Sequence, residues 1–226
     1  MEAANDWTNQ EIVETVEKRL EKYELVKDRI ESILSRDRVL QKLVHSKKFR
    51  FKDLSHLDEK ITRKNSELLA EGKELITKEN VFSKVTDIVG IRVLHLYMGQ
   101  FRDIHQQLMS YVDNGDLVLF EQPKAYSWDP EYVDLFMSLG LEAHHKESLY
   151  TSVHYVFKLR DDNPHACEVQ VRTLFEEVWG EIDHTVNYPE KTRSLAIKEQ
   201  LKVLARVVGA GTRLSDSIFN VHGADV

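Results

Sequence analysis

The stretch from Ala166 to Tyr188 changes its hydrophobic period in the middle, and this change constrains the fold more than any other feature of the chain. In residues 168–172 polar and β-branched residues alternate, which predicts a strand with Glu168, Gln170 and Arg172 on one face. Further on, apolar residues recur every four positions, as in a helix. That helix has a polar row opposite its apolar stripe, made of Glu177, Gly180, His184 and Asn187. An edge strand with a polar outer face would show the same alternation. A functional site therefore requires further polar residues elsewhere in the chain that lie beside these.

Composition indicates a globular protein that can bury a sizeable core. The 226 residues are 42% hydrophobic and 31% charged, with a formal net charge of −7. The chain as a whole is therefore not a nucleic-acid clamp. The single cysteine, Cys167, excludes an internal disulfide, and no apolar run has membrane-spanning length. The acidic N-terminus lacks the features of a signal peptide, so we expect a cytoplasmic protein without membrane contact.

Hydrophobic patterning predicts one domain over residues 1–226. Residues 8–43 are expected to form one long helix, opened by a capping box at Thr8. A core follows over residues 44–190, in which residues 121–147 are expected to be irregular apart from a short helix near 130–139. The helix of the opening stretch should end at Pro189. Residues 190–222 then form a helical segment, interrupted near Gly209 and Gly211.

Basic residues concentrate in residues 44–64. Arg50 and Lys52 are two positions apart, so an extended segment presents both cations on one face. If a helix begins near Ser55, Lys60 and Arg63 lie one and two turns along it. Such a cluster suits a polyphosphate, although a charge run can also be a solvated surface.

Two further segments place polar residues in predicted strands. Residues 81–97 are apolar on both faces, as in a central strand, except for Asp87 and Arg92. A buried arginine requires an anionic partner, either a carboxylate or a ligand phosphate. Residues 149–159 place Tyr150, Ser152 and His154 on one face, which suits base stacking with hydrogen-bonding groups beside it. The turn at 161–164 makes this strand the antiparallel neighbour of residues 166–172. His144 and His145 are adjacent and are predicted to lie in a loop rather than a metal site.

Four motifs, in order over about residues 44–190, resemble the synthetase domain of RelA/SpoT-type enzymes. They are FRFKDLSHLDEKI, TDIVGIRV, LYTSVHYV and EVQVRTLFEEVWGEIDHTVNY. The chain is thus similar to a small, single-domain alarmone synthetase. The resemblance implies an α/β (α+β), nucleotidyltransferase-like fold, with a mixed sheet of about five strands surrounded by helices. It also implies a GTP pyrophosphokinase, which transfers the β,γ-pyrophosphate of ATP to the 3′-hydroxyl of GDP or GTP and releases AMP.

The resemblance also implies roles for individual residues. Asp87 and Glu168 match the family's acids, and they are the expected catalytic residues and ligands of Mg²⁺. The expected ATP-binding residues are Arg50, Lys52, Lys60, Arg63 and Arg92. Tyr150 matches the tyrosine that stacks on guanine. The other expected GDP- or GTP-binding residues are Ser152, His154, Gln170, Arg172, His184 and Asn187.

One motif departs from the family pattern. Leu149-Tyr150-Thr151-Ser152 stands where the family usually has Gly-Tyr-Arg-Ser, so a flexible glycine and a cation are both replaced. The identity of the nucleotide that accepts the pyrophosphate is therefore less well defined by the sequence than that of ATP as the donor. Two alternatives stay open: a toxin-type relative that pyrophosphorylates tRNA 3′ ends or adenosine nucleotides, and a catalytically silent nucleotide-binding module. By analogy with the family, a homo-oligomer, specifically a tetramer, is also expected.

Overall fold

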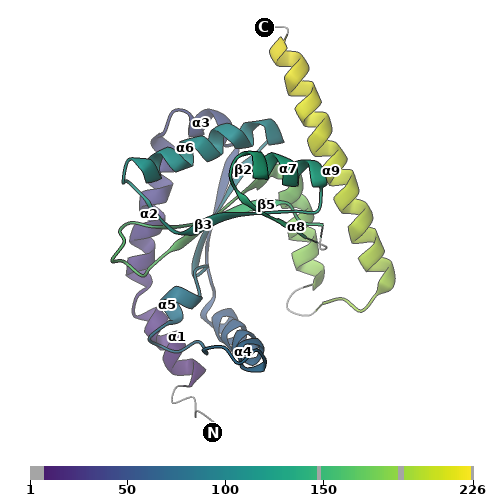
Figure 1. Ribbon diagram of the computed structural model, residues 1–226. Coiled ribbons are helices and arrows are strands. Elements are labelled where there is room, and N and C mark those ends of the chain that lie inside the picture. The colour runs from purple at the N-terminus through teal and green to yellow at the C-terminus, as the bar shows by residue number, and fades with distance from the viewer. Residues whose placement is uncertain (1–7, 147–148, 188–190, 225–226) are drawn as a thin grey trace.

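A six-stranded mixed sheet forms the centre of the molecule (Figure 1). The computed structural model describes residues 8–146, 149–187 and 191–224. The spatial order of the strands is β1-β2-β6-β5-β3-β4, with β2 and β6 parallel and β5 and β6 antiparallel. The strands are β1 (Ser46–Phe51), β2 (Val89–His95), β3 (Val118–Ser127), β4 (Glu142–His145), β5 (Ser152–Lys158) and β6 (Cys167–Thr173). The predicted α/β class is confirmed, with six strands where about five were expected.

Helices cover both faces of this sheet. They are α1 (Asn9–Glu17), α2 (Leu20–Arg36), α3 (Leu40–Leu43), α4 (Leu54–Ala70), α5 (Val81–Lys84), the short 3₁₀ helix η1 (Met98–Gln100), α6 (Phe101–Asp113), α7 (Pro130–Ser138), α8 (Leu174–Asn187) and α9 (Leu195–Ala224). Both α2 and α8 contact β2 and β6, and Figure 1 shows them on opposite sides of the sheet. The α2 side holds the core, where Val26 and Ile30 join Val169 and Val171. None of the helices in the described residues has the length and apolar composition needed to cross a bilayer.

The prediction of one helix over residues 8–43 was wrong. The capping box at Thr8 opens α1 as expected, but the chain forms three helices, with breaks after Glu17 and after Arg36. At the second break the Asp37 carboxylate accepts hydrogen bonds from the backbone amides of Val39 and Leu40. Periodicity did not reveal these breaks because the apolar spacing continues across them.

The expected irregular segment at residues 121–147 is largely ordered. The strand β3 continues to Ser127, and β4 pairs with it in parallel at the edge of the sheet. His144 and His145 therefore lie in β4 rather than in the predicted loop. The predicted short helix is present as α7, capped by the Asp129 side chain. The alternation in β3 was hidden by bulges between Leu119 and Lys124, which shift the register against β5.

The last helix, α9, is continuous through Gly209 and Gly211, so the predicted interruption there was wrong. A Cβ atom at Gly209 would lie 3.3 Å from the Trp128 ring, and one at Gly211 would lie 2.7 Å from the Phe175 ring. The two glycines therefore let large aromatic side chains approach the α9 backbone closely. They allow packing and do not break the helix.

The acidic side of α8 faces the protein, whereas part of its apolar stripe is exposed. Glu176, Glu177 and Trp179 are buried, but Val178 is 53% exposed and Ile182 is 40% exposed. The inward side of α8 lies over the polar face of the sheet, where carboxylates find cationic partners. The predicted end of this helix at Pro189 lies outside the described residues.

Candidate active site

The polar face of the sheet is built by cross-strand neighbours from β1, β2, β6 and β5. Arg50 pairs in register with Gly90, which pairs with Glu168. Because Gly90 has no side chain, the space between these two charged residues stays open. The predicted antiparallel pairing of β5 with β6 is confirmed, and it places His154 opposite Gln170.

Three neighbouring cavities share this polar face. The first, of about 380 Å³, is lined by both Asp87 and Glu168, together with Arg50, Lys52, Arg92, Gln170 and His184. The second, of about 420 Å³, shares Asp87, Arg50, Lys52 and His184 with the first and adds Lys60, Arg63, Asn187 and Lys191. The third, of about 310 Å³, shares Arg92, Gln170 and His184 with the first and adds Tyr150, Arg172, Trp179, Asp183 and Asn187. Residues far apart in the sequence thus converge on one continuous polar region.

We name two parts of this region. The cationic side comprises Arg50, Lys52, Lys60 and Arg63, from β1, its C-terminal end and α4. The tyrosine side comprises Tyr150, His154, Gln170 and Arg172, from β5, β6 and the loop before β5. Asp87 lies on the first side and Glu168 lies between the two.

Asp87 is held by two lysines of the cationic side. Its carboxylate lies 3.0 Å from Lys52 Nζ and 2.6 Å from Lys60 Nζ. Lys60 reaches it from α4, which begins at Leu54 after the Asp53 cap, close to the predicted start near Ser55. Burial raises the pKa of Asp87, but the two lysines outweigh burial and bring its pKa to about 2. Asp87 is therefore ionised at neutral pH.

Glu168 is held by its neighbours on the sheet. Its carboxylate lies 3.1 Å from His154 Nδ1 and accepts a 2.7 Å hydrogen bond from Gln170 Nε2. Burial raises the pKa of Glu168, but the contacts with His154 and Gln170 together lower it, and the net shift is downward. The other ring nitrogen of His154 lies 3.2 Å from the Tyr150 hydroxyl. One imidazole thus connects the acid to the tyrosine.

Tyr150 sits on a strained turn. The preceding residue, Leu149, has φ of +57°, a left-handed conformation that costs an L-residue roughly 1–2 kcal/mol. This is the position where the resembling family usually has glycine, which adopts such a conformation freely. The Arg172 guanidinium lies 5.6 Å from the centre of the Tyr150 ring, and the Trp179 ring lies 6.4 Å from it. The ring is therefore already braced by the protein.

Glu177 joins three cations, and sequence reasoning did not assign it to the site. Its carboxylate lies 2.7 Å from Lys48 Nζ and 3.1 Å from Arg92 Nη1, and it forms an ion pair with Arg172. Arg92 also pairs with Glu181. Burial raises the pKa of Glu177, but Lys48 and the two arginines outweigh it and lower the pKa. The signals in the sequence were the polar row of α8 and the alternation of Lys48 with Arg50.

The structure distinguishes among the predicted acceptor residues. Arg172 is only 4% exposed, because Gly180 leaves room for its guanidinium under α8. Its partners are Glu177 and the Tyr150 hydroxyl, so its main contacts are internal. Ser152 is 1% exposed, and its hydroxyl donates to the Val171 carbonyl at 3.4 Å. Ser152 is thus packed within the sheet and does not open to the three cavities.

His184 and Asn187 lie on α8 at the edge of the polar region. His184 is exposed and lines all three cavities. The Asn187 side chain donates to Asp183 at 2.8 Å and accepts from the Thr192 amide at 3.0 Å. Asn187 therefore fixes the exit of α8 as well as lining a cavity.

The acids at this site fit a magnesium ion. Within the described parts of the chain, no three His, Cys, Asp or Glu side chains gather into a metal centre. Mg²⁺ usually takes only one or two protein carboxylates and completes its shell with water and substrate phosphates. Asp87 and Glu168 supply two carboxylates, both ionised, to one cavity. The predicted pair of acids thus matches this ion's preference.

The chain belongs to the family described as the region found in RelA/SpoT proteins, which matches residues 49–193. Its fold is similar to that of small alarmone synthetase 1 from Bacillus subtilis, with a TM-score of 0.66 at 21% identity over 92% of this chain and 96% of that one. The structure of the Bacillus protein bound to its product pppGpp gives a TM-score of 0.63 at 20% identity, covering 93% and 97%. A GTP pyrophosphokinase family protein from Streptococcus pneumoniae gives 0.65 at 20% identity, covering 93% and 94%. Comparison with curated protein sequences returns no significant match.

Proposed function

We propose that this protein is a GTP pyrophosphokinase that transfers the β,γ-pyrophosphate of ATP to the 3′-hydroxyl of GDP or GTP. The observation that carries this proposal is the convergence of Asp87 and Glu168 on one cavity, beside Arg50 and Lys52. Membership of the RelA/SpoT family and the similarity to a protein whose product is pppGpp support it. A binding module would not require two ionised acids at the same place.

The cationic side is the proposed ATP site. A triphosphate needs several positive charges, and Arg50, Lys52, Lys60 and Arg63 line one cavity of suitable size. Arg50 and Arg63 are exposed, so both are accessible to a ligand. Arg92 is a weaker member of this set, because Glu177 and Glu181 already hold its guanidinium.

The tyrosine side is the proposed acceptor site. Tyr150 lines the third cavity and offers a ring for stacking on a purine. Gln170, His184 and Asn187 supply hydrogen-bonding groups at the same cavity. His154 lies behind them, between Tyr150 and Glu168, and orients both.

The transfer is a displacement at phosphorus. The acceptor 3′-oxygen attacks the β-phosphorus of ATP, the bond from that phosphorus to the α,β-bridging oxygen breaks, and AMP leaves. Glu168, which is ionised, accepts the proton of the 3′-hydroxyl. Asp87 and Glu168 would hold Mg²⁺, which when bound supplies charge neutralisation at the transferred group. The lysines beside Asp87 stabilise the negative charge of the triphosphate.

Labelled ATP tests this function directly. The protein is incubated with Mg²⁺, γ-labelled ATP and one acceptor at a time: GDP, GTP, ATP or deacylated tRNA. Label appearing in GDP or GTP supports the proposal. Label in tRNA or in an adenosine nucleotide would replace it with the toxin-type activity, and no transfer with any acceptor would leave a nucleotide-binding module. Glu168→Gln is the matched control, because it keeps the shape of the side chain and removes its charge.

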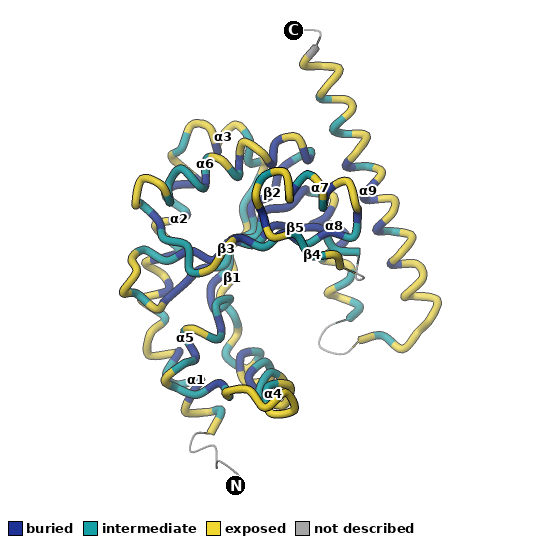
Figure 2. Tube along the Cα trace, in the orientation of Figure 1, coloured by how far each residue is buried: buried dark blue, intermediate teal, exposed yellow. Residues whose placement is uncertain are grey.

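We also propose that the protein forms homo-oligomers through α9. The side chains of Val203, Val207, Leu214, Ile218 and Val221 on this helix are between 55% and 62% exposed. Figure 2 shows most of α9 as exposed. Light scattering after size-exclusion chromatography measures the mass in solution, and Val207→Glu should lower it. A monomeric mass for the unchanged protein would refute this part of the proposal.

A further inference from the structure

The loop that carries Tyr150 is held from two directions. The side chain of Leu149 packs with Tyr150 and Leu204 on a small cluster formed by Trp179, Ala205 and Val208. This cluster joins α8 to α9, and the Trp179 indole donates to the Leu201 carbonyl at 3.1 Å. The apolar contact thus fixes one side of the strained turn.

The other side of the turn is fixed by polar contacts of Thr151. Its backbone amide donates to Glu176 Oε2 at 3.2 Å, and its hydroxyl lies 3.0 Å from the Ser127 hydroxyl. Thr151 is 2% exposed and Glu176 is 2% exposed. Because the Thr151 amide is out of contact with water, it depends on the Glu176 carboxylate for its hydrogen bond.

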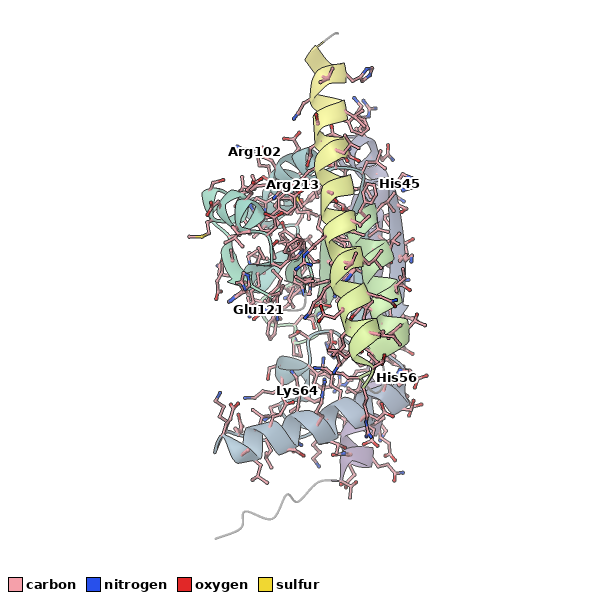
Figure 3. The ribbon with its side chains drawn as sticks, turned by 90° about the vertical axis from the view of Figure 1, so that its right-hand side faces the viewer. His45, His56, Lys64, Arg102, Glu121 and Arg213 are labelled. Atoms are coloured by element: carbon pink, nitrogen blue, oxygen red, sulfur yellow. The ribbon has the colours of Figure 1, made fainter. Side chains whose placement is uncertain are left out.

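The surroundings of Glu176 agree with this role. Arg172 from β6, Asp129 before α7 and Tyr132 on α7 are the charged or titratable groups around it. Burial raises the pKa of Glu176 to about 7, against the hydrogen bond from Thr151. Asp129 is itself held at 2.5 Å by Arg213 of α9, a residue labelled in Figure 3. Burial disfavours the ionised form of Glu176, and the contact that its side chain makes with the loop is the hydrogen bond from the Thr151 amide.

We propose that Glu176 is a positioning residue for the acceptor nucleotide: its carboxylate holds the Thr151 amide and so keeps the left-handed turn at Leu149 that aims the Tyr150 ring. This inference rests on the proposed function of Tyr150 in acceptor binding. Glycine needs no such anchor at positive φ, whereas leucine does. Glu176 therefore supports a backbone conformation that is costly for a leucine at position 149.

The test compares two substitutions of similar size. Glu176→Gln keeps an oxygen that accepts from the Thr151 amide, and Glu176→Met removes it. We expect Glu176→Met to raise the acceptor KM roughly tenfold, the scale of one buried hydrogen bond, with the ATP KM changed less than about twofold. Glu176→Gln should stay close to the parent protein. Glu31→Gln, at a partly exposed position of α2 outside the proposed α9 interface, is the control for a lost surface charge.

Amide hydrogen exchange gives a readout that does not need catalysis. Exchange at Thr151 should be faster in Glu176→Met and nearly unchanged in Glu176→Gln. If the parent protein transfers to no acceptor, the proposed function fails, and the exchange data still decide whether Glu176 anchors the turn. If Glu176→Met does not fold, Ser127→Ala removes the second anchor and should raise the acceptor KM by about two- to threefold.

Three results would overturn the proposal. The first is unchanged exchange at Thr151 in Glu176→Met. The second is an equal rise in both KM values, which would indicate general damage to the site. The third is equal impairment of Glu176→Gln and Glu176→Met, because the two differ in the hydrogen-bond acceptor at issue.

Discussion

The cationic side and the tyrosine side of the site are built on opposite principles. On the cationic side, Arg50 and Arg63 are exposed, and Lys52 and Lys60 share one carboxylate, Asp87. The positive charge there exceeds its internal compensation, as expected for a surface that receives a polyphosphate.

On the tyrosine side the polar groups find their partners inside the protein. Arg172 pairs with Glu177, Glu168 contacts His154 Nδ1, and Glu176 accepts a hydrogen bond from the Thr151 amide. The helix α8 supplies the two glutamates that do this bracing. The cationic side thus attracts its ligand by charge, whereas the tyrosine side presents the Tyr150 ring in a fixed orientation.

Substitution of the two acids, Asp87 on the cationic side and Glu168 between the two sides, should give the largest effect. Asp87→Ala and Glu168→Ala should each lower kcat at least about a thousandfold, because each removes a carboxylate proposed to act on the transferred group. Turnover with labelled ATP measures the loss, and circular dichroism checks that the fold remains. Near-normal turnover of either variant would show that the cavity is not the site of transfer.

Loss of the Glu177–Arg172 ion pair on the tyrosine side should give the second-largest effect, on the stability of the fold. Glu177→Met leaves the buried Arg172 without its partner, and we expect the free energy of unfolding to fall by about 3–5 kcal/mol. Denaturant unfolding measures this change. The control is Glu181→Gln on the same helix, whose carboxylate is half exposed and should matter by less than about 1 kcal/mol. Equal losses in both variants would contradict the contrast between braced and open charges.

The pH dependence of stability tests whether the buried Glu176 on the tyrosine side behaves differently from an exposed acid. The pKa of Glu176 is raised to about 7 by burial, so the folded state holds a proton that the unfolded state releases near pH 4.5. Its stabilising contribution is complete below about pH 4.5 and is lost as pH rises through about 7, a change of roughly 3 kcal/mol. Glu176→Gln mimics the protonated acid, so its melting temperature relative to the parent should rise between pH 5 and pH 8. A constant difference over that range would show that Glu176 does not titrate there.

Tyr150→Ala should give the smallest of these changes. Loss of a stacking contact should weaken acceptor binding by about 1–3 kcal/mol, while the ATP KM stays within about twofold. Steady-state kinetics with each substrate varied in turn separates the two constants. Tyr150→Phe keeps the ring and serves as the matched control. A similar rise in both constants would mean that the tyrosine side does not serve one substrate alone.

Much of the arrangement could be predicted from the sequence. The alternation of Glu168, Gln170 and Arg172 placed them on one face, and the turn before them made β5 and β6 antiparallel neighbours. The helix after Asp53 and the acidic partners of the half-buried Arg92 also followed from local rules. These features depend on residues close in the chain or on the cost of burying a charge.

Other features required the tertiary structure. The sequence alone determined that α8 has one apolar and one polar side, but packing decided that Glu176 and Glu177 face inward while Val178 faces outward. Likewise, the sequence predicts breaks at Gly209 and Gly211, because periodicity does not show the aromatic rings that approach these glycines. Which side of a helix is buried depends on what the other elements present to it, and no local pattern contains that information. Local sequence determined the strands, the helices and which residues share a face. Contacts between charged residues that are far apart in the sequence decided where the site lies and which side chains hold it in place.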